Sequence, residues 1–139
     1  MINRNGSNKF IDANIFLEIL LDDENADRCS IFFKGLINGD FKAITSDFII
    51  YTCVLKIERK LNSKKVMRKF ISSIKSMKGL TIVRPSIKVM YNSTKIGEKY
   101  NLDFDDSLIV SVMMEYGVDE IVSFDKHFDK VEMIKRVEP

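Results

Sequence analysis

Short apolar runs alternate along this chain with longer segments in which apolar residues recur every three or four positions. The short runs cover residues 9–12, 41–45, 80–83 and 121–123 and have the composition of buried strands, and a last edge strand is expected near 131–135. The longer segments predict amphipathic helices at about 15–20, 29–37, 47–61, 63–78, 86–100 and 105–116. This alternation predicts an α/β fold, in which helices cover both faces of a central, mainly parallel sheet.

Length and composition fit one compact domain. The chain has 139 residues, of which 45% are hydrophobic and only 2 are proline and 6 glycine, so we expect a single domain over residues 1–139 rather than a disordered or fibrous protein. The formal net charge of +2 is too small to indicate nucleic-acid binding by itself. Whether the protein binds nucleic acid must therefore be judged from the distribution of charge along the chain.

The two cysteines and the amino terminus bear on where the protein acts. Cys29 and Cys53 lie among apolar residues of predicted helices and lack zinc-binding spacing, so they are expected to be buried thiols. The first nine residues are polar and contain no apolar region typical of a signal peptide. No apolar run approaches the length that spans a bilayer, so we expect a cytoplasmic protein with no membrane partner.

Three apolar runs end in an aspartate. Asp12 and Asp125 each close a predicted strand, and Asp106 opens a predicted helix. Each could be an ordinary helix or turn cap. Together, however, acids at strand ends and helix starts gather at the carboxyl edge of a parallel sheet, where they repel one another unless a cation compensates them. Carboxylate oxygens suit Mg²⁺ or Mn²⁺, and the pattern therefore predicts a metal-dependent phosphodiester hydrolase.

The same residues carry a resemblance to a known family. The segments Phe-Ile-Asp-Ala-Asn at 10–14, Thr-Ser-Asp at 45–47, Leu-Asp-Phe-Asp-Asp-Ser-Leu-Ile at 102–109 and Ile-Val-Ser-Phe-Asp-Lys-His-Phe at 121–128 resemble the PIN domain, and within it the VapC-type toxins. The resemblance covers nearly the whole chain in the right order. It implies a three-layer α/β/α PIN-like domain that cleaves single-stranded RNA with Mg²⁺ or Mn²⁺, is usually dimeric, and is often held inactive by an antitoxin protein.

The resemblance also assigns roles to individual residues. It implies that Asp12, Asp106 and Asp125 are the catalytic metal ligands, with Asp105 as the neighbour in reserve. Asn14 and Ser123 lie where the family often places small polar groups that orient the acids or a bound water, roles that fit hydrogen bonding around a metal site.

One position departs from the family pattern. The family normally has a glutamate about five residues into the helix that follows Ser46 and Asp47, and here that position is Thr52. Glu58 cannot replace it, because six residues of helix turn it about 120° away and move it about 9 Å along the axis. This departure keeps two functions open: a nuclease with weak activity, and a catalytically weakened PIN-like module that binds RNA or a protein partner.

Basic residues flank this part of the chain. An RNA-contacting surface and an ordinary solvated helix face are equally consistent with their positions. The residues are Lys56, Arg59, Lys60, Lys64, Lys65 and Arg68.

Two other chemistries fit the sequence poorly. The single histidine, His127, excludes a metal-free ribonuclease mechanism that needs two histidines, and it is expected to be an exposed turn residue. A receiver or dehalogenase-like domain with an aspartate nucleophile would place a second acid at position 14, where the chain has Asn14.

Overall fold

Five parallel strands form the centre of the molecule. The computed structural model describes residues 8–139, so the expectation about the polar amino terminus lies largely outside the described residues. The strands are β1 (Asn8–Ile11), β2 (Lys42–Ser46), β3 (Leu80–Val83), β4 (Glu120–Val122) and β5 (Lys135–Val137). They lie in the order β3-β2-β1-β4-β5, and every neighbouring pair is parallel. The predicted parallel sheet is confirmed.

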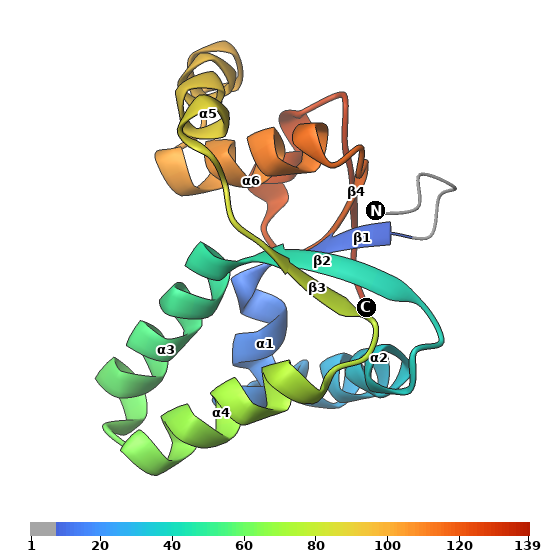
Figure 1. Cartoon of the computed structure of the whole chain (residues 1–139), viewed down its shortest axis with the longest axis vertical. Helices are drawn as coiled ribbons and strands as arrows, with labels where there is room; N and C mark the ends of the chain where they lie inside the picture. Colours follow the sequence, from blue (N-terminus) through green and yellow to red (C-terminus); the bar gives the residue numbers. More distant parts are fainter. Residues whose placement is uncertain (1–7) are drawn as a thin grey trace.

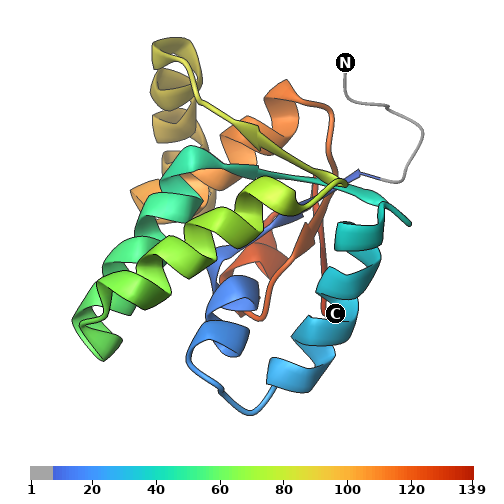
Figure 2. The same cartoon turned by 60° about the horizontal axis from the view of Figure 1, so that its bottom comes forward.

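Helices cover both faces of this sheet, which gives three layers (Figures 1 and 2). On one face lie α1 (Ala13–Leu20), α2 (Ala26–Asn38), α3 (Asp47–Leu61) and α4 (Lys64–Ser76). On the other lie α5 (Ile87–Tyr100) and α6 (Phe104–Glu115), which pack against each other. None of the helices in residues 8–139 is long and apolar enough to cross a bilayer.

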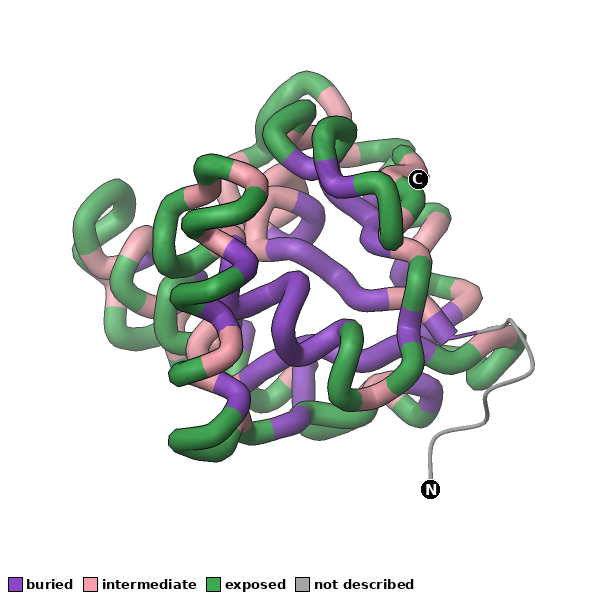
Figure 3. The backbone as a smooth tube through the Cα atoms, turned by 90° about the horizontal axis from the view of Figure 1, so that it is seen from above, coloured by how far each residue is buried: buried purple, intermediate pink, exposed green. Residues whose placement is uncertain are grey.

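The core lies between these layers and includes the middle of α6. Figure 3 shows the buried strands running through the centre of the molecule, with the exposed parts of the helices around them. Residues 107–113 of α6 are all buried, so the middle of this helix is enclosed on every side, whereas Phe104 and Met114 at its ends are exposed. Both cysteines are free and buried, as predicted, and burial raises the pKa of the Cys53 thiol to about 12.

The last strand begins later than its sequence predicted. We expected it near residues 131–135, but Val131 and Ile134 belong to a turn that follows a short 3₁₀ helix, η1 (Lys126–Lys130). Their backbone N–H groups bond to carbonyls three residues earlier, and Val131 is buried there. Their apolar side chains pack against the core from a turn, and the sheet ladder starts only at Lys135.

The strand order fixes where a ligand site is expected. The chain winds outward from β1 to β2 and β3, then returns to the other side of β1 with β4 and β5. The connections therefore diverge between β1 and β4, and the crevice at the carboxyl ends of such strands is where open α/β sheets bind ligands. Asp12 follows β1 there, and Ser123 and Asp125 follow β4.

Candidate functional site

A cleft of about 220 Å³ opens at this divergence point. The three predicted aspartates, Asp12, Asp106 and Asp125, all line it, although they are far apart in the sequence. The remaining lining residues come from α1, α3 and α6: Ala13, Asn14, Leu17, Phe48, Ile49, Thr52, Asp105 and Ile109. Tertiary structure thus brings together the acids that the strand-end pattern singled out.

Asp12 is the most buried of these acids, with 7% of its surface exposed. Its backbone N–H bonds to the Val122 carbonyl, 3.1 Å away, which ties the end of β1 to β4. One carboxylate oxygen accepts the backbone N–H of Ala13 at 2.8 Å, and so caps α1. The other accepts the Ser123 hydroxyl at 2.6 Å and the Asn14 amide at 3.3 Å. These donors hold the carboxylate in one orientation at the cleft.

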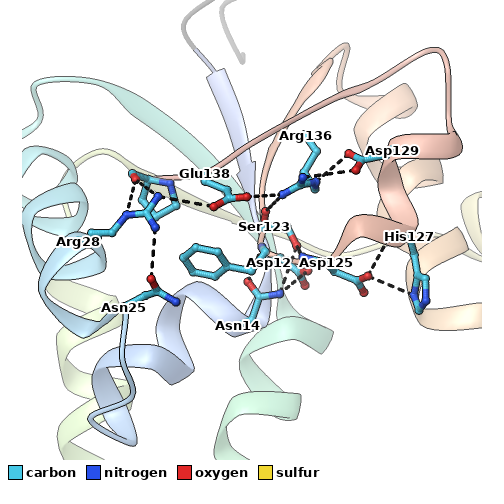
Figure 4. A network of polar contacts seen from close by, with 12 residues as sticks. Asp12, Asn14, Asn25, Arg28, Ser123, Asp125, His127, Asp129, Arg136 and Glu138 are labelled. Atoms are coloured by element: carbon cyan, nitrogen blue, oxygen red, sulfur yellow. Dashed lines mark hydrogen bonds and ion pairs between the residues drawn. The ribbon is translucent and has the colours of Figure 1, made fainter.

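Asn14 and Ser123 link the ends of β1 and β4 through further hydrogen bonds (Figure 4). The Asn14 amide also donates to Ser123 Oγ at 3.2 Å, and the backbone N–H of Asp125 donates to the same oxygen at 3.0 Å. The Asn14 side-chain oxygen accepts the Phe124 N–H at 3.3 Å. Both residues therefore contact the backbone or the carboxylate of these acids and lie where they can orient them.

Arg136 supports this network from outside the cleft, a contact that sequence reasoning missed. Its Nη1 donates to the Ser123 carbonyl at 3.1 Å, and its guanidinium is paired with Asp129 and Glu138 (Figure 4). These bonds raise the Arg136 pKa above its ordinary value, so the side chain is always charged. It fixes the backbone at the point where Ser123 reaches Asp12.

Asp106 reaches the cleft from the first turn of α6. Asp103 precedes this helix as its N-cap residue, and the hydroxyl of Ser107 bonds back to the Asp103 carbonyl at 2.7 Å. A Cβ at Gly97 would lie 2.7 Å from that hydroxyl oxygen, so glycine permits the close approach of α5 to α6. This packing places Asp106 opposite Asp12 and Asp125.

Asp125 and Asp106 form a cluster with His127 on the outer side of the cleft. His127 Nδ1 lies 3.1 Å from Asp125 Oδ1 and 3.7 Å from Asp106 Oδ2. Among residues 8–139, these three side chains can each offer one ligand atom within 4.8 Å of the other two. Asp125 Oδ1 also accepts the His127 backbone N–H at 2.9 Å, so this aspartate serves as a turn cap and lines the cleft at the same time.

The acids disturb one another's ionisation. Burial raises the pKa of Asp12 above its ordinary value, against the bonds from Ser123 and Ala13, and the neighbouring charges of Asp125 and Asp105 raise it further. Burial, followed by the charges of Asp125, Asp12 and Asp105, raises the pKa of Asp106 to about 6. Such a site favours any ligand that brings positive charge.

The raised pKa of Asp106, caused first by burial and then by repulsion, predicts how stability depends on pH in the metal-free protein. Because the folded-state pKa of Asp106 is raised, its contribution to stability is fully present below about pH 4 and is lost as pH rises through about 6. We expect Asp106→Asn to stabilise the metal-free protein at pH 7 by about 1 kcal/mol, a value discounted for solvent screening. Urea unfolding in EDTA at pH 7 and pH 5 measures this, and an equal effect of the substitution at both pH values would contradict it.

Thr52 lies where the sequence placed it, on the cleft, but it brings no charge there. Its hydroxyl donates to the Phe48 carbonyl at 2.8 Å, within α3. Glu58 is not a lining residue and instead forms an ion pair with Lys64. Asp105 lines the cleft next to Asp106, although it is absent from the His127 cluster.

The basic residues fall on two helices at different distances from the acids. Lys56 and Arg59 follow Thr52 by four and seven positions on α3, so they extend the cleft-facing side of that helix by about 6 and 10 Å. Lys60 is exposed near the end of α3. Lys65 and Arg68 are exposed on α4, whereas Lys64 is already paired with Glu58.

Comparisons with known proteins identify a family and proteins of similar fold. Residues 9–133 match the PIN domain family. Ribonuclease VapC6 of Methanocaldococcus jannaschii is 24% identical over 93% of this chain and 95% of its own length. In fold, the chain is similar to Mycobacterium tuberculosis VapC20, described as a sarcin-ricin loop cleaving toxin (TM-score 0.76, 12% identity, 94% of this chain and 98% of that one).

A second solved structure has the same fold. It is VapBC2 of Rickettsia felis bound to a DNA fragment from its promoter, with a TM-score of 0.74 and 12% identity over 95% of this chain and 98% of that one. The family match spans the whole segment from β1 to the turn after η1, and thus all the cleft residues. On this evidence the chain belongs to the PIN domain family.

Proposed function

We propose that this protein is a divalent-metal-dependent endoribonuclease that cleaves single-stranded RNA. The observation that carries the proposal is the convergence of Asp12, Asp106 and Asp125 on one cleft at the divergence point of a parallel sheet. Burial, and after it the neighbouring carboxylates, raises the pKa of Asp12 and of Asp106, so a bound cation would stabilise their charged forms. The matching family and the relative named as a ribonuclease support the same activity.

The donor set fits Mg²⁺ or Mn²⁺, because the cleft offers carboxylate oxygens from several elements. Asp12, Asp106 and Asp125 would hold the ion. When bound, a divalent cation would polarise a phosphate oxygen and lower the pKa of a water molecule that can attack the phosphorus atom. Ser123 and Asn14 keep Asp12 turned toward the cleft, and Asp105 adds negative charge beside Asp106.

The experiment is cleavage of a fluorescently labelled single-stranded RNA by the purified chain. We expect cuts that leave a 5′-phosphate in the presence of Mn²⁺ or Mg²⁺, and a fall in rate of at least about 100-fold when EDTA removes the ion. Full activity in EDTA would overturn the proposal. A double-stranded RNA of the same sequence serves as the control, and we expect slower cleavage of it.

We further propose that Lys56, Arg59, Lys60, Lys65 and Arg68 attract the RNA backbone. Lys56 and Arg59 support this best, because they continue the cleft-facing side of α3. A strand held there would pass from basic residues to the acidic cleft, where bound cations complete the charge balance. Lys64 contributes less, since Glu58 already neutralises it. A cellular RNA substrate would place the protein in the cytoplasm.

An antitoxin partner and a homodimer complete this proposal. Similar folds occur in VapBC2 and in a toxin-antitoxin complex from Klebsiella pneumoniae, which supports a protein inhibitor for this chain as well. Ile87 and Tyr91 lie one turn apart on α5 and are 77% and 64% exposed. Large exposed apolar side chains of this kind are typical of protein interfaces, and a second copy would cover them.

A second candidate function is binding without cleavage, and Thr52 is the observation that favours it. The cleft lacks the glutamate usual in the family, and no other acid from α3 lines it. A non-catalytic module would bind RNA or protein equally well in EDTA and in Mn²⁺. The cleavage experiment separates this function from the enzyme.

A further inference from the structure

The imidazole of His127 is the one nitrogen ligand that the described cleft region offers. It lies in η1, the short turn that follows Asp125, and its Nδ1 faces the acids rather than solvent. The side chain as a whole is 69% exposed, which leaves the far edge of the ring in water. The ring is thus oriented by its neighbours although it is not enclosed.

The backbone accounts for the placement of this ring. Asp125 Oδ1 accepts the His127 backbone N–H and thereby closes the turn. The next residue, Phe128, is fully buried and anchors η1 in the core. With the backbone held on both sides, the His127 side chain leaves the turn toward Asp106 and Asp125.

The distances suit ligands of one ion. His127 Nδ1 is 3.1 Å from Asp125 Oδ1 and 3.7 Å from Asp106 Oδ2, and all three donor atoms lie within 4.8 Å of one another. Adjacent ligands at octahedral bond lengths are about 3.0 Å apart, so small side-chain rotations suffice. A neutral imidazole with its proton on Nε2 presents the Nδ1 lone pair to this position.

We infer that His127 is a nitrogen ligand of the cation held by Asp106 and Asp125, an inference that rests on the proposed function. This ligand makes the site selective for Mn²⁺ over Mg²⁺. An imidazole nitrogen is a softer donor than a carboxylate oxygen, and Mn²⁺, as a first-row transition metal, accepts it more readily than Mg²⁺, which keeps oxygen ligands and its own waters. With Thr52 in place of the glutamate usual in the family, the cleft has one carboxylate fewer, and His127 adds a nitrogen donor, which is softer than oxygen. Both changes favour the binding of Mn²⁺ over that of Mg²⁺.

The test measures metal binding directly in the full chain. Pulsed electron paramagnetic resonance of bound Mn²⁺ should show coupling to a coordinated ¹⁴N nucleus, and His127→Gln should abolish that signal. By titration calorimetry, His127→Gln should weaken Mn²⁺ binding about 10-fold and change Mg²⁺ binding less than about twofold. Gln keeps the backbone bond to Asp125, and Lys126→Gln in the same exposed turn is the matched control.

Two results would overturn the inference, and they differ in what they say about the enzyme. If Mn²⁺ binds and Asp12→Asn weakens it, but no ¹⁴N coupling is seen, His127 is not a ligand and the proposed nuclease site stands. If the wild-type chain binds no Mn²⁺ at all, the inference and the proposed function fail together.

Discussion

Replacing Asp12 with asparagine is expected to lower the rate of RNA cleavage at least about 100-fold. Asp12 is the most buried acid of the cleft and lies beside the divergence of β1 and β4. Asparagine has nearly the same shape but lacks the negative charge, so the cleft loses a ligand for the cation. The measurement is the single-turnover rate on labelled RNA in saturating Mn²⁺, compared with the wild-type chain.

Two further variants make this result interpretable. Asp23→Asn removes the same charge from an exposed loop outside the cleft and should leave the rate unchanged. Asp12→Asn also replaces a carboxylate whose two oxygens together accept three donors, so its folding must be checked by circular dichroism. Asp106→Asn avoids this difficulty, since no hydrogen bond of the network depends on it. Wild-type rates in both site variants would rule out catalysis in this cleft.

Restoring a carboxylate at position 52 is expected to have the second largest effect. Thr52→Glu should tighten Mg²⁺ binding about 10-fold and raise the Mg²⁺-supported cleavage rate by a similar factor. Thr52 is exposed on the cleft, and its hydroxyl bonds only to the Phe48 carbonyl of its own helix, so the replacement disturbs no packing. Titration calorimetry with Mg²⁺ and the cleavage assay measure the two effects.

The control for this gain is Thr52→Gln, which adds the same length of side chain without the charge. Glutamine should leave Mg²⁺ affinity and rate close to those of the wild-type chain. If the two variants behave alike, the position does not contribute to a metal site. The metal-free Thr52→Glu protein should also unfold at a slightly lower urea concentration, because a further negative charge then faces Asp106 and Asp12.

Much of the fold and of the acidic cleft follows from the sequence for one physical reason. Hydrophobic periodicity identifies strands and helices, and residues at the carboxyl ends of parallel strands must share an edge. Asp12 and Asp125 each follow a strand, so the sequence places both at one edge of the sheet, and they meet there because β1 and β4 are neighbours in the strand order. Asp106 joins Asp12 and Asp125 in this prediction because it opens a helix, and the start of such a helix lies at the same edge of the sheet.

What the sequence could not predict depends on side-chain direction or on packing between distant segments. For His127 the sequence predicts only an exposed turn residue, because nothing in its neighbours fixes where the ring points. Its contact with Asp125 is local, but its approach to Asp106 arises only when the folded chain brings η1 near the first turn of α6. The contact of Arg136 with the Ser123 carbonyl likewise joins β5 to the end of β4, and no pattern in the local sequence indicates it.

The most direct test of the central claim is a crystal structure of the chain grown with Mn²⁺, with anomalous diffraction recorded at the manganese absorption edge. The account predicts an anomalous peak in the cleft, within bonding distance of Asp12, Asp106 or Asp125, that disappears in Asp12→Asn crystals. A cleft without a peak at saturating Mn²⁺, or manganese bound only elsewhere, would contradict it.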